Sequence, residues 1–239
     1  SAGVLKTMRS GALARYTLAI RCESTDPPII CGTDRHDRTI LTKTINATKS
    51  VGSNTFPHTQ WTSWIESVPS SHPEGREWAA DRIADTTAPI IIDIGCGEGT
   101  YSDIARELRP DALCIGVDIW PQYVDEFKLW HKYDFVVTRD ARDLAFPFAP
   151  YVLLAGDVLE HMRRSESVAL LQRAKLNAQA IMVSVPIIDY PQHAHPDGNP
   201  YEAHVDQWSH DDMLAELDNC DSWVGDVVGR YWWTPQWWV

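Results

Sequence analysis

One stretch constrains the fold of this chain more than any other: PIIIDIGCGEGTYS, residues 89–102. It joins an apolar, β-branched run to glycines at every second position and then to the start of a helix. Residues 90–92 suit a strand that is buried on both faces of a parallel sheet. The glycines allow a tight turn with room for a ligand, and the N-terminus of a helix over residues 100–108 favours an anion. The stretch therefore predicts a strand, a ligand-binding turn and a helix.

Two kinds of site could follow such a strand. A dinucleotide site has the spacing G-x-G-x-x-G, with a pyrophosphate over the first helical turn. Here Gly95, Gly97 and Gly99 give G-x-G-x-G, and Asp93 lies two positions before the first glycine. A carboxylate there would repel a pyrophosphate, but it can accept hydrogen bonds from an amine while backbone amides hold a carboxylate. The pattern favours an amino-acid-like ligand.

On these residues the segment resembles the first motif of the class I S-adenosylmethionine-dependent methyltransferases, in which D-x-G-x-G-x-G surrounds the methionine end of the cofactor. The resemblance implies that the cofactor is S-adenosyl-L-methionine. It also implies the residues that contact the methionine end, which are Asp93, Gly95, Cys96, Gly97 and Gly99.

Apolar strands and amphipathic helices alternate after the glycine turn. Further strands are expected at residues 112–118, 135–137, 151–156, 180–185 and 223–233. Helices are expected at residues 123–133, at 165–176 with Ser165 as its cap, and at 213–217 after a Ser209/Asp212 capping box. This alternation predicts a doubly wound, mostly parallel α/β sheet with helices on both faces. It has six strands, or seven if residues 236–239 form a short last strand rather than a packed terminus. The resemblance implies the same Rossmann-like methyltransferase fold.

The chain is predicted to divide into an N-terminal extension, residues 1–56, and a methyltransferase domain, residues 57–239. In the extension, residues 15–21 and 39–45 alternate as half-buried strands do, with turn residues between them, so a hairpin or a flexible arm is expected. Two helices are expected to precede the first strand of the domain, at residues 61–65 and 78–84.

Acidic residues end several of the predicted strands, where doubly wound sheets bind their ligands. Asp118 follows the glycines at a spacing from which its carboxylate can accept from both ribose hydroxyls. Ile119 and Trp120 are expected to cover the adenine. The resemblance places Asp140 and Ala141 at the adenine amino group and ring, although Asp140 could instead form a turn with its own backbone.

The fourth strand runs into DVLEHM, residues 157–162, which resembles the segment that lines the methyl-transfer site in this family. Asp157 is expected to contact the cofactor and the reacting groups. Because the sulfonium is already activated, alignment supplies most of the rate, and a base is needed only for a hydroxyl or protonated amine. His161 is the candidate base. The competing interpretation is a histidine that binds the backbone and shapes the turn.

A long loop over residues 186–210 stands where a short connection would suffice, and loops of this length are usually functional. Its sequence resembles methyltransferases of bacterial and phage accessory gene sets, whose acceptors are often unassigned. The loop residues predicted to bind substrate are His193, His195, Glu202 and His204. Neutral imidazoles would favour a transition metal over magnesium, but hydrogen bonding to the substrate is preferred and no metal is predicted.

The charge of the chain bears on its acceptor. The formal net charge is −12, and because residues 1–50 carry +4, the rest carries −16. Nucleic-acid binding needs basic surface, so a nucleic-acid acceptor is disfavoured. No apolar run approaches the roughly 20 residues of a membrane span. Five cysteines without metal-type spacing and no signal peptide indicate a cytoplasmic protein.

The sequence thus predicts an enzyme that methylates a hydroxyl or amine of a small-molecule or glycan-like acceptor. The alternatives are a protein of the same fold that binds the cofactor or a partner subunit without turnover, and a nucleic-acid methyltransferase.

Overall fold

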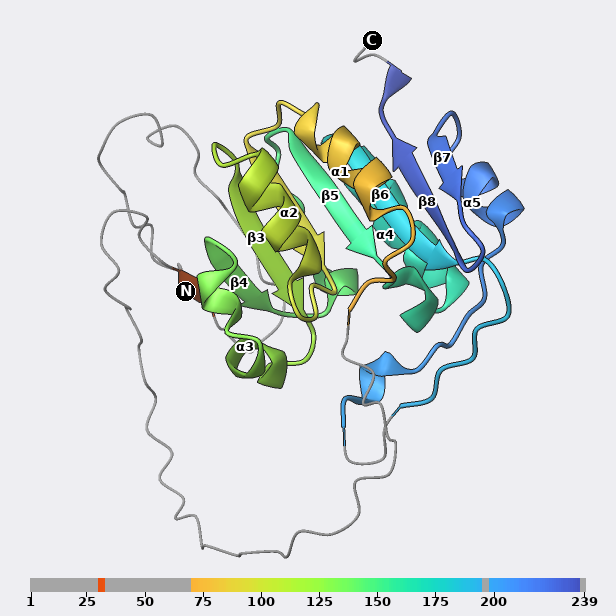
Figure 1. Ribbon diagram of the computed structural model, residues 1–239, viewed down its shortest axis with the longest axis horizontal. Helices are drawn as coiled ribbons and strands as arrows, with labels where there is room; N and C mark the ends of the chain where they lie inside the picture. The colour runs from red at the N-terminus through yellow and green to blue at the C-terminus, as the bar shows by residue number, and fades with distance from the viewer. Residues whose placement is uncertain (1–29, 33–69, 195–197, 237–239) are drawn as a thin grey trace, which may run out of the picture.

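A computed structural model of the protein describes residues 30–32, 70–194 and 198–236. Its strands are β1 (Ile30–Gly32), β2 (Ile90–Ile94), β3 (Leu113–Asp118), β4 (Phe135–Thr138), β5 (Tyr151–Gly156), β6 (Ala178–Pro186), β7 (Asp221–Val224) and β8 (Val228–Trp233). They form one sheet in the order β1-β4-β3-β2-β5-β6-β8-β7 (Figure 1).

The centre of the sheet is parallel. β2 pairs in parallel with both β3 and β5, and β3–β4 and β5–β6 are also parallel. The remaining pairs, β1–β4, β6–β8 and β7–β8, are antiparallel. The chain moves outward from β2 through β3 to β4 and then returns to β5 on the other side of β2, which makes a topological switch point where such folds bind ligands. The predicted doubly wound, mostly parallel sheet is therefore confirmed.

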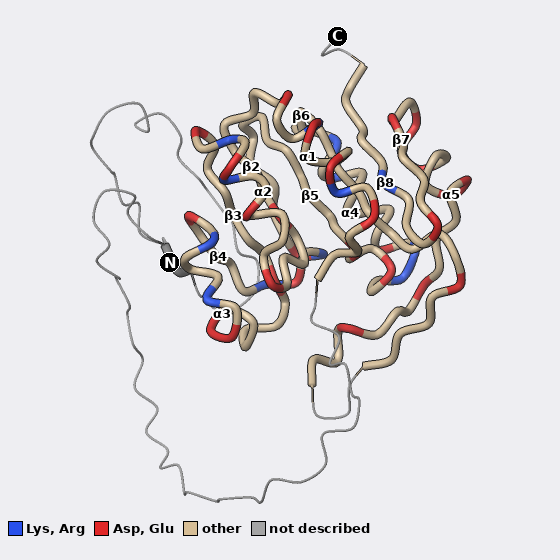
Figure 2. The backbone as a smooth tube through the Cα atoms, in the orientation of Figure 1, with Lys and Arg blue, Asp and Glu red and all other residues tan. Residues whose placement is uncertain are grey.

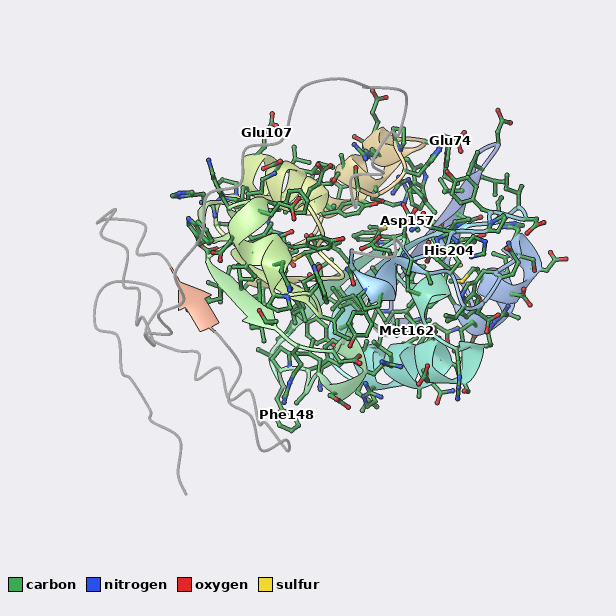
Figure 3. The ribbon with its side chains drawn as sticks, turned by 90° about the horizontal axis from the view of Figure 1, so that it is seen from below. Glu74, Glu107, Phe148, Asp157, Met162 and His204 are labelled. Carbon is green, nitrogen blue, oxygen red and sulfur yellow. The ribbon has the colours of Figure 1, made fainter. Side chains whose placement is uncertain are left out.

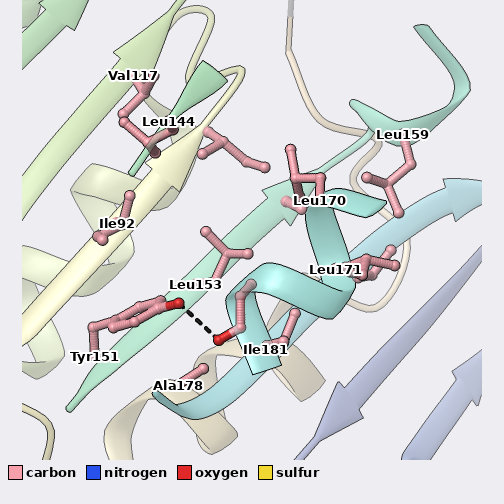
Figure 4. Close-up of a cluster of buried hydrophobic side chains, with 14 of the residues drawn as sticks. Ile92, Val117, Leu144, Tyr151, Leu153, Leu159, Leu170, Leu171, Ala178 and Ile181 are labelled. Atoms are coloured by element: carbon pink, nitrogen blue, oxygen red, sulfur yellow. Dashed lines mark hydrogen bonds between the residues drawn. The ribbon is translucent and has the colours of Figure 1, made fainter. Parts of the chain in front are cut away.

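Helices cover both faces of the sheet. They are α1 (Arg76–Ala84), α2 (Thr100–Leu108), α3 (Gln122–Glu126), α4 (Arg164–Lys175) and α5 (His210–Glu216). Buried residues of α1, α2 and α3 pack with Ile91 and Leu154 on one face, and those of α4 and α5 pack with Ile92 and Leu153 on the other. Figure 4 shows the α4 side, where the Tyr151 hydroxyl donates to the carbonyl oxygen of Ala174 at 2.7 Å. Among the described residues, no helix has the length and hydropathy of a membrane span.

Several predicted elements end where local backbone geometry changes. The expected strand over 223–233 is wrong, because Gly225 begins a turn, with its N–H on the carbonyl of Val228 at 2.9 Å, that splits it into β7 and β8. The split adds a strand to the six predicted after residue 89. Residues 236–239 were the predicted position of a seventh strand, and of these 237–239 lie outside the described residues. The expected helix over 123–133 is interrupted by Lys128 in the left-handed region (φ 52°) and continues as a 3-10 turn, η1 (Leu129–His131).

Helix starts also differ in part from the prediction. Ser165 does not cap α4; the helix begins earlier, and the N–H of Arg163 donates to Glu166 at 3.0 Å. The capping box of Ser209 and Asp212 is confirmed, although α5 begins at His210.

Most of the N-terminal predictions fall on residues that the structure does not describe. The expected strands at 15–21 and 39–45 and the helix at 61–65 lie outside the described residues, whereas α1 confirms the helix predicted at 78–84. β1 lies in the segment predicted to be turns and pairs with β4 at the edge of the sheet. The division between residues 56 and 57 stays a prediction.

Candidate functional site

A cavity of about 560 Å³ opens at the carboxyl ends of β2, β3, β5 and β6, across the switch point of the sheet. The predicted residues that line it are Asp93, Gly95, Cys96, Gly97, Asp118, Ile119, Asp140, Ala141, Asp157, His161, Glu202 and His204. Gly99, Trp120 and His193 do not line it, and His195 lies outside the described residues. Figure 3 labels Asp157, which directly follows β5, and His204 of the 186–210 loop, and the two lie close together in that view.

The glycine turn has the conformation that its spacing predicts. Gly95, Gly97 and Gly99 have φ values of 60°, 48° and 86°, which L side chains rarely adopt. A Cβ on Gly95 would also overlap the side chain of Val158. Gly99 starts α2 and packs against Lys132, away from the cavity, so its contribution is to the turn.

Two buried carboxylates flank the turn. Asp93 accepts from the Tyr133 hydroxyl at 2.6 Å, and burial, with the nearby Asp118 charge, raises its pKa to about 7. Asp118 accepts from the N–H groups of Gly97 and Trp120 at 2.9 and 2.8 Å. Burial raises the pKa of Asp118 to about 6. Each carboxylate oxygen has a second lone pair, so both side chains can still accept from a ligand.

Residues that follow β3 and β4 form another part of the cavity wall. Ile119 lines the cavity, but the Trp120 ring points toward Tyr201, with ring centroids 6.4 Å apart. Asp140 lines the cavity and also forms the local turn that was the alternative to a ligand contact, since it accepts from the N–H of Arg142 at 2.9 Å. Burial opposes its ionisation, but hydrogen bonds from Arg142 lower the pKa of Asp140 overall.

Asp157 holds a segment that the sequence did not single out. Its backbone is left-handed (φ 54°), and one carboxylate oxygen accepts from the Ser71 hydroxyl at 2.8 Å and the N–H of His72 at 2.6 Å. The other accepts from the Ser184 hydroxyl at 2.6 Å. Asp157 therefore fixes residues 71–72 at the cavity wall.

Arg230 of β8 holds the same segment from the other side. It is fully buried and donates to the carbonyl oxygens of His72 and Glu74, both at 2.5 Å, and to the Tyr101 hydroxyl. No local pattern in the sequence predicts that Arg230 holds this segment, because an arginine within an alternating strand is expected to face solvent.

The far end of the cavity is formed by the 3-10 turn η3 (Leu159–His161) and the 186–210 loop. The Nδ1 of His161 lies 3.1 Å from the carbonyl oxygen of Ala203, and the Nδ1 of His204 lies 2.7 Å from that of Tyr190. The two rings meet edge to face with centroids 4.8 Å apart. Burial lowers the pKa of both imidazoles, and for His204 the neighbouring His161 adds to this.

Two glutamates complete this end. Glu202 accepts from the Tyr123 hydroxyl at 2.9 Å and from the Asn199 amide at 3.0 Å, and burial raises its pKa. Glu160, which was not predicted as a site residue, is 2% exposed, and burial holds the pKa of its carboxyl well above the ordinary value. Glu160, His161 and His204 each place one possible metal-ligand atom within 4.8 Å of the others.

A family model matches the part of the chain that supplies much of this cavity. Residues 92–175, which include the glycine turn, Asp118 and His161, match a family model described as a methyltransferase domain. No curated protein matches the sequence.

Solved structures are similar at low identity. The small RNA methyltransferase HEN1 is 16% identical over 76% of this chain and 27% of its own, with a TM-score of 0.52. Human N-acetylserotonin methyltransferase in complex with SAM (18% identity, 68% and 51%, TM-score 0.49) and the mitomycin 7-O-methyltransferase MmcR (16%, 67% and 54%, 0.45) are also similar. This chain spans about half of the latter two and less of HEN1. At 16% identity the likeness to HEN1 shows the fold alone.

The matched family model covers the end of β2, the glycine turn and the strand-end acids on which the resemblance was based. Residues 92–175 therefore carry a methyltransferase domain, which agrees with the S-adenosylmethionine-dependent methyltransferase that the sequence predicts.

Proposed function

We propose that this domain transfers the methyl group of S-adenosylmethionine to a hydroxyl of a small-molecule or glycan-like acceptor bound within the cavity. One observation carries the proposal: a single cavity joins a glycine turn flanked by carboxylates to a pair of half-buried imidazoles. The first end suits the cofactor, and the second suits a polar acceptor that carries a proton.

The cofactor would lie along the glycine turn. The ionised Asp93 would accept from its ammonium group, and the bare backbone at Gly95 and Gly97 would lie against its methionine chain. Asp118 would accept from the two ribose hydroxyls, with its own carboxylate oriented by the N–H groups of Gly97 and Trp120. Asp140 and Ala141 would then lie beside the adenine.

The acceptor would occupy the end of the cavity at η3. Because a carbonyl oxygen can only accept, the Nδ1 atoms of His161 and His204 must donate, which leaves each Nε2 with a free lone pair. One Nε2 would take the hydroxyl proton as the acceptor oxygen bonds to the methyl carbon. The carbon–sulfur bond breaks, and its electron pair stays on sulfur as adenosylhomocysteine leaves.

The polar side chains around the acceptor end of the cavity support a polar acceptor. Glu202, Asn199 and Tyr190 line the same end of the cavity, and these side chains pair with hydroxyl and amine groups. In Figure 2 the Lys and Arg segments are scattered among Asp and Glu over the described backbone. With a net charge of −12, this distribution offers little to a phosphate backbone.

The test uses the full chain with radiolabelled S-adenosylmethionine against three acceptor sets: sugars and small polyols, glycans, and RNA or DNA oligonucleotides. We expect label in a hydroxyl of the first or second set. Label transferred only to oligonucleotides would contradict the acceptor class, and a melting temperature unchanged by saturating adenosylhomocysteine would contradict the cofactor site.

The proton acceptor can be tested on the same reaction. If an imidazole is the base, turnover should rise with pH through a pKa below the ordinary histidine value of 6.5, because the base acts in its neutral form. A rate that stays flat through this range at saturating cofactor would show that alignment alone carries the reaction.

A further inference from the structure

The end of the cavity at η3 brings together three side chains of metal-binding type. Glu160 and His161 end the segment after β5, and His204 comes from the loop after β6. One oxygen or nitrogen atom from each lies within 4.8 Å of the others, and all three residues line the cavity. We propose that Glu160, His161 and His204 bind a divalent transition-metal ion at the acceptor end of this cavity.

Glu160 provides the first independent argument. Its side chain is 2% exposed, and neither carboxylate oxygen has a hydrogen-bond partner among the residues that the structure describes. Buried carboxylates are ordinarily hydrogen-bonded, paired with a cation or bound to a metal. Asp157 and Glu202 lie near enough to add negative potential rather than to neutralise it. A cation at this point would satisfy the carboxylate.

The two histidines provide the second argument. Each donates from Nδ1 to a backbone carbonyl, His161 to Ala203 and His204 to Tyr190. Metal-binding histidines are usually oriented in this way, since the outer hydrogen bond fixes the ring and the tautomer and directs the other nitrogen to the ion. In this tautomer Nε2 of each ring carries the lone pair that can bind an ion, and the two rings lie edge to face with centroids 4.8 Å apart.

The backbone around the three residues is also held in place. The carbonyl oxygen of Glu160 accepts from the N–H groups of Val205 and Asp206 at 2.9 and 3.1 Å. These bonds join the loop directly to η3, so the ligands on the two segments keep their separation without a bound ion. A preorganised set of this kind favours binding because little order must be gained when the ion arrives.

The ligand set indicates the class of metal. Two imidazole nitrogens and one carboxylate oxygen suit Zn²⁺, Co²⁺, Fe²⁺ or Mn²⁺, whereas Mg²⁺ and Ca²⁺ prefer oxygen ligands throughout. Three protein ligands leave coordination positions for water or an acceptor oxygen. Binding of the ion can be tested independently of the proposed function. With the ion bound, the Nε2 lone pairs of His161 and His204 are held by the metal, so an imidazole acts as the base of the proposed reaction only in the metal-free site. The effect of a metal on the acidity of an acceptor hydroxyl rests on the proposed function.

Calorimetric titration of the full chain, freed of metal with a chelator, tests the site with Co²⁺, Zn²⁺ and Mg²⁺ as the ions. We expect one Co²⁺ or Zn²⁺ per chain at this site. Glu160→Gln keeps the size of the side chain and removes its charge, and His204→Gln removes one nitrogen ligand. Each should weaken binding by more than about 100-fold, beyond the usual loss for an outer hydrogen-bond partner.

The matched control is His193→Gln, which removes an exposed histidine of the same loop outside the cavity. It should leave the affinity unchanged. Thermal melting and adenosylhomocysteine binding at the far end of the cavity show that each variant is folded. If Glu160→Gln does not fold, His204→Gln and the Co²⁺ absorption spectrum of the wild type, which reports nitrogen ligation, decide the question.

The proposal is overturned if the wild type binds neither Co²⁺ nor Zn²⁺, if His204→Gln binds them as the wild type does, or if Mg²⁺ binds as tightly as they do. Adenosylhomocysteine binding without metal binding would reject the metal site alone. Metal binding without transfer to any acceptor would reject the proposed function alone.

Discussion

The two ends of the cavity are built in opposite ways. At the cofactor end, Asp93, the glycine turn and Asp118 come from one strand–helix–strand unit, and their backbone positions follow from the two parallel strands they end. At the acceptor end, η3 meets a loop that returns after another helix and strand, and long-range hydrogen bonds hold the two together. The first end is fixed by local sequence, whereas the second depends on contacts between distant segments.

The two ends of the cavity also differ in how their carboxylates are hydrogen-bonded. Both carboxylates of the cofactor end accept hydrogen bonds from the protein, while the Glu160 carboxylate at the acceptor end has no hydrogen-bond partner among the described residues. Under the proposed function, the cofactor end presents carboxylates that the protein already orients, whereas the Glu160 carboxylate of the acceptor end stays available to a reacting molecule or an ion. Changes at one end should therefore leave the other unaffected.

The largest effect is expected from His161→Ala. It should lower turnover by about 10²–10⁴-fold, the range for loss of a proton-transfer group, and leave cofactor affinity within a few fold. Turnover at saturating cofactor and calorimetry with adenosylhomocysteine measure the two. His193→Ala is the control because His193 is exposed and outside the cavity. Unchanged turnover in the His161 variant would remove it from the chemical step and turn attention to His204.

The converse change is Asp118→Ala. It should weaken binding of S-adenosylmethionine by about 2–3 kcal/mol, or about 30- to 150-fold, because charged hydrogen bonds at a buried site are lost. Turnover at saturating cofactor should change far less than the affinity. Asp125→Ala, which alters an exposed carboxylate on α3, serves as the control. Wild-type affinity in a folded Asp118 variant would show that this carboxylate does not bind the cofactor.

The pH dependence of cofactor binding should be smaller and confined to the same end. The pKa of Asp93 is raised to about 7, and only its ionised form accepts from an ammonium group. Affinity should therefore fall by about 10-fold between pH 8 and pH 6, as the carboxyl takes up a proton. Calorimetry across this range measures it, and Asp93→Asn should flatten the profile while lowering the affinity at pH 8.

The raised pKa of Asp93 affects the stability of the free protein in the opposite direction: low pH, which weakens cofactor binding, favours the folded state. Since the pKa values of Asp93 and Asp118 are raised above the ordinary value of 3.8, the folded state binds more protons than the unfolded state at intermediate pH. Their contribution to the free energy of unfolding is greatest below pH 3.8 and is lost as the pH rises through about 6 and 7. The free energy of unfolding of wild type and of Asp93→Asn should be measured from pH 4 to pH 8. Equal slopes against pH in the two proteins would show that Asp93 does not contribute to this dependence.

The smallest effect is expected from Ser71→Ala. The substitution removes one of three donors to Asp157, so the free energy of unfolding should fall by about 1 kcal/mol. Ser70→Ala, at an exposed neighbouring position, is the matched control and should have little effect. Denaturant unfolding measures both. Equal stabilities for the two variants would mean that residue 71 does not anchor this segment to Asp157.

Much of the fold could be predicted because it follows from short-range patterns. The apolar β-branched run gave β2, the spaced glycines gave the left-handed turn, and the alternation of strands and helices gave the parallel order. Two predicted elements were wrong for local reasons. Gly225 starts a hairpin turn inside the expected strand over 223–233, and Lys128 adopts a left-handed backbone inside the expected helix over 123–133.

The candidate site was predicted unevenly for the same reason. Asp93, Gly95, Gly97 and Asp118 reach the cavity because strand ends of a parallel sheet meet at one edge. The hydrogen bonds of Asp157 to Ser71 and His72 could not be foreseen, since its partners lie far away in the sequence.

By itself the sequence determined that this chain folds as a doubly wound sheet with a tight glycine turn after β2, since the period of apolar residues and the spacing of glycines are properties of neighbouring residues. Only the tertiary structure decided which of the loop residues face the cavity. It paired His161 with His204, buried the Glu160 carboxylate near them without a hydrogen-bond partner among the described residues, and placed His193 outside the cavity. Those outcomes depend on how a long loop closes over the sheet, and loop closure is governed by contacts between segments that no local pattern encodes.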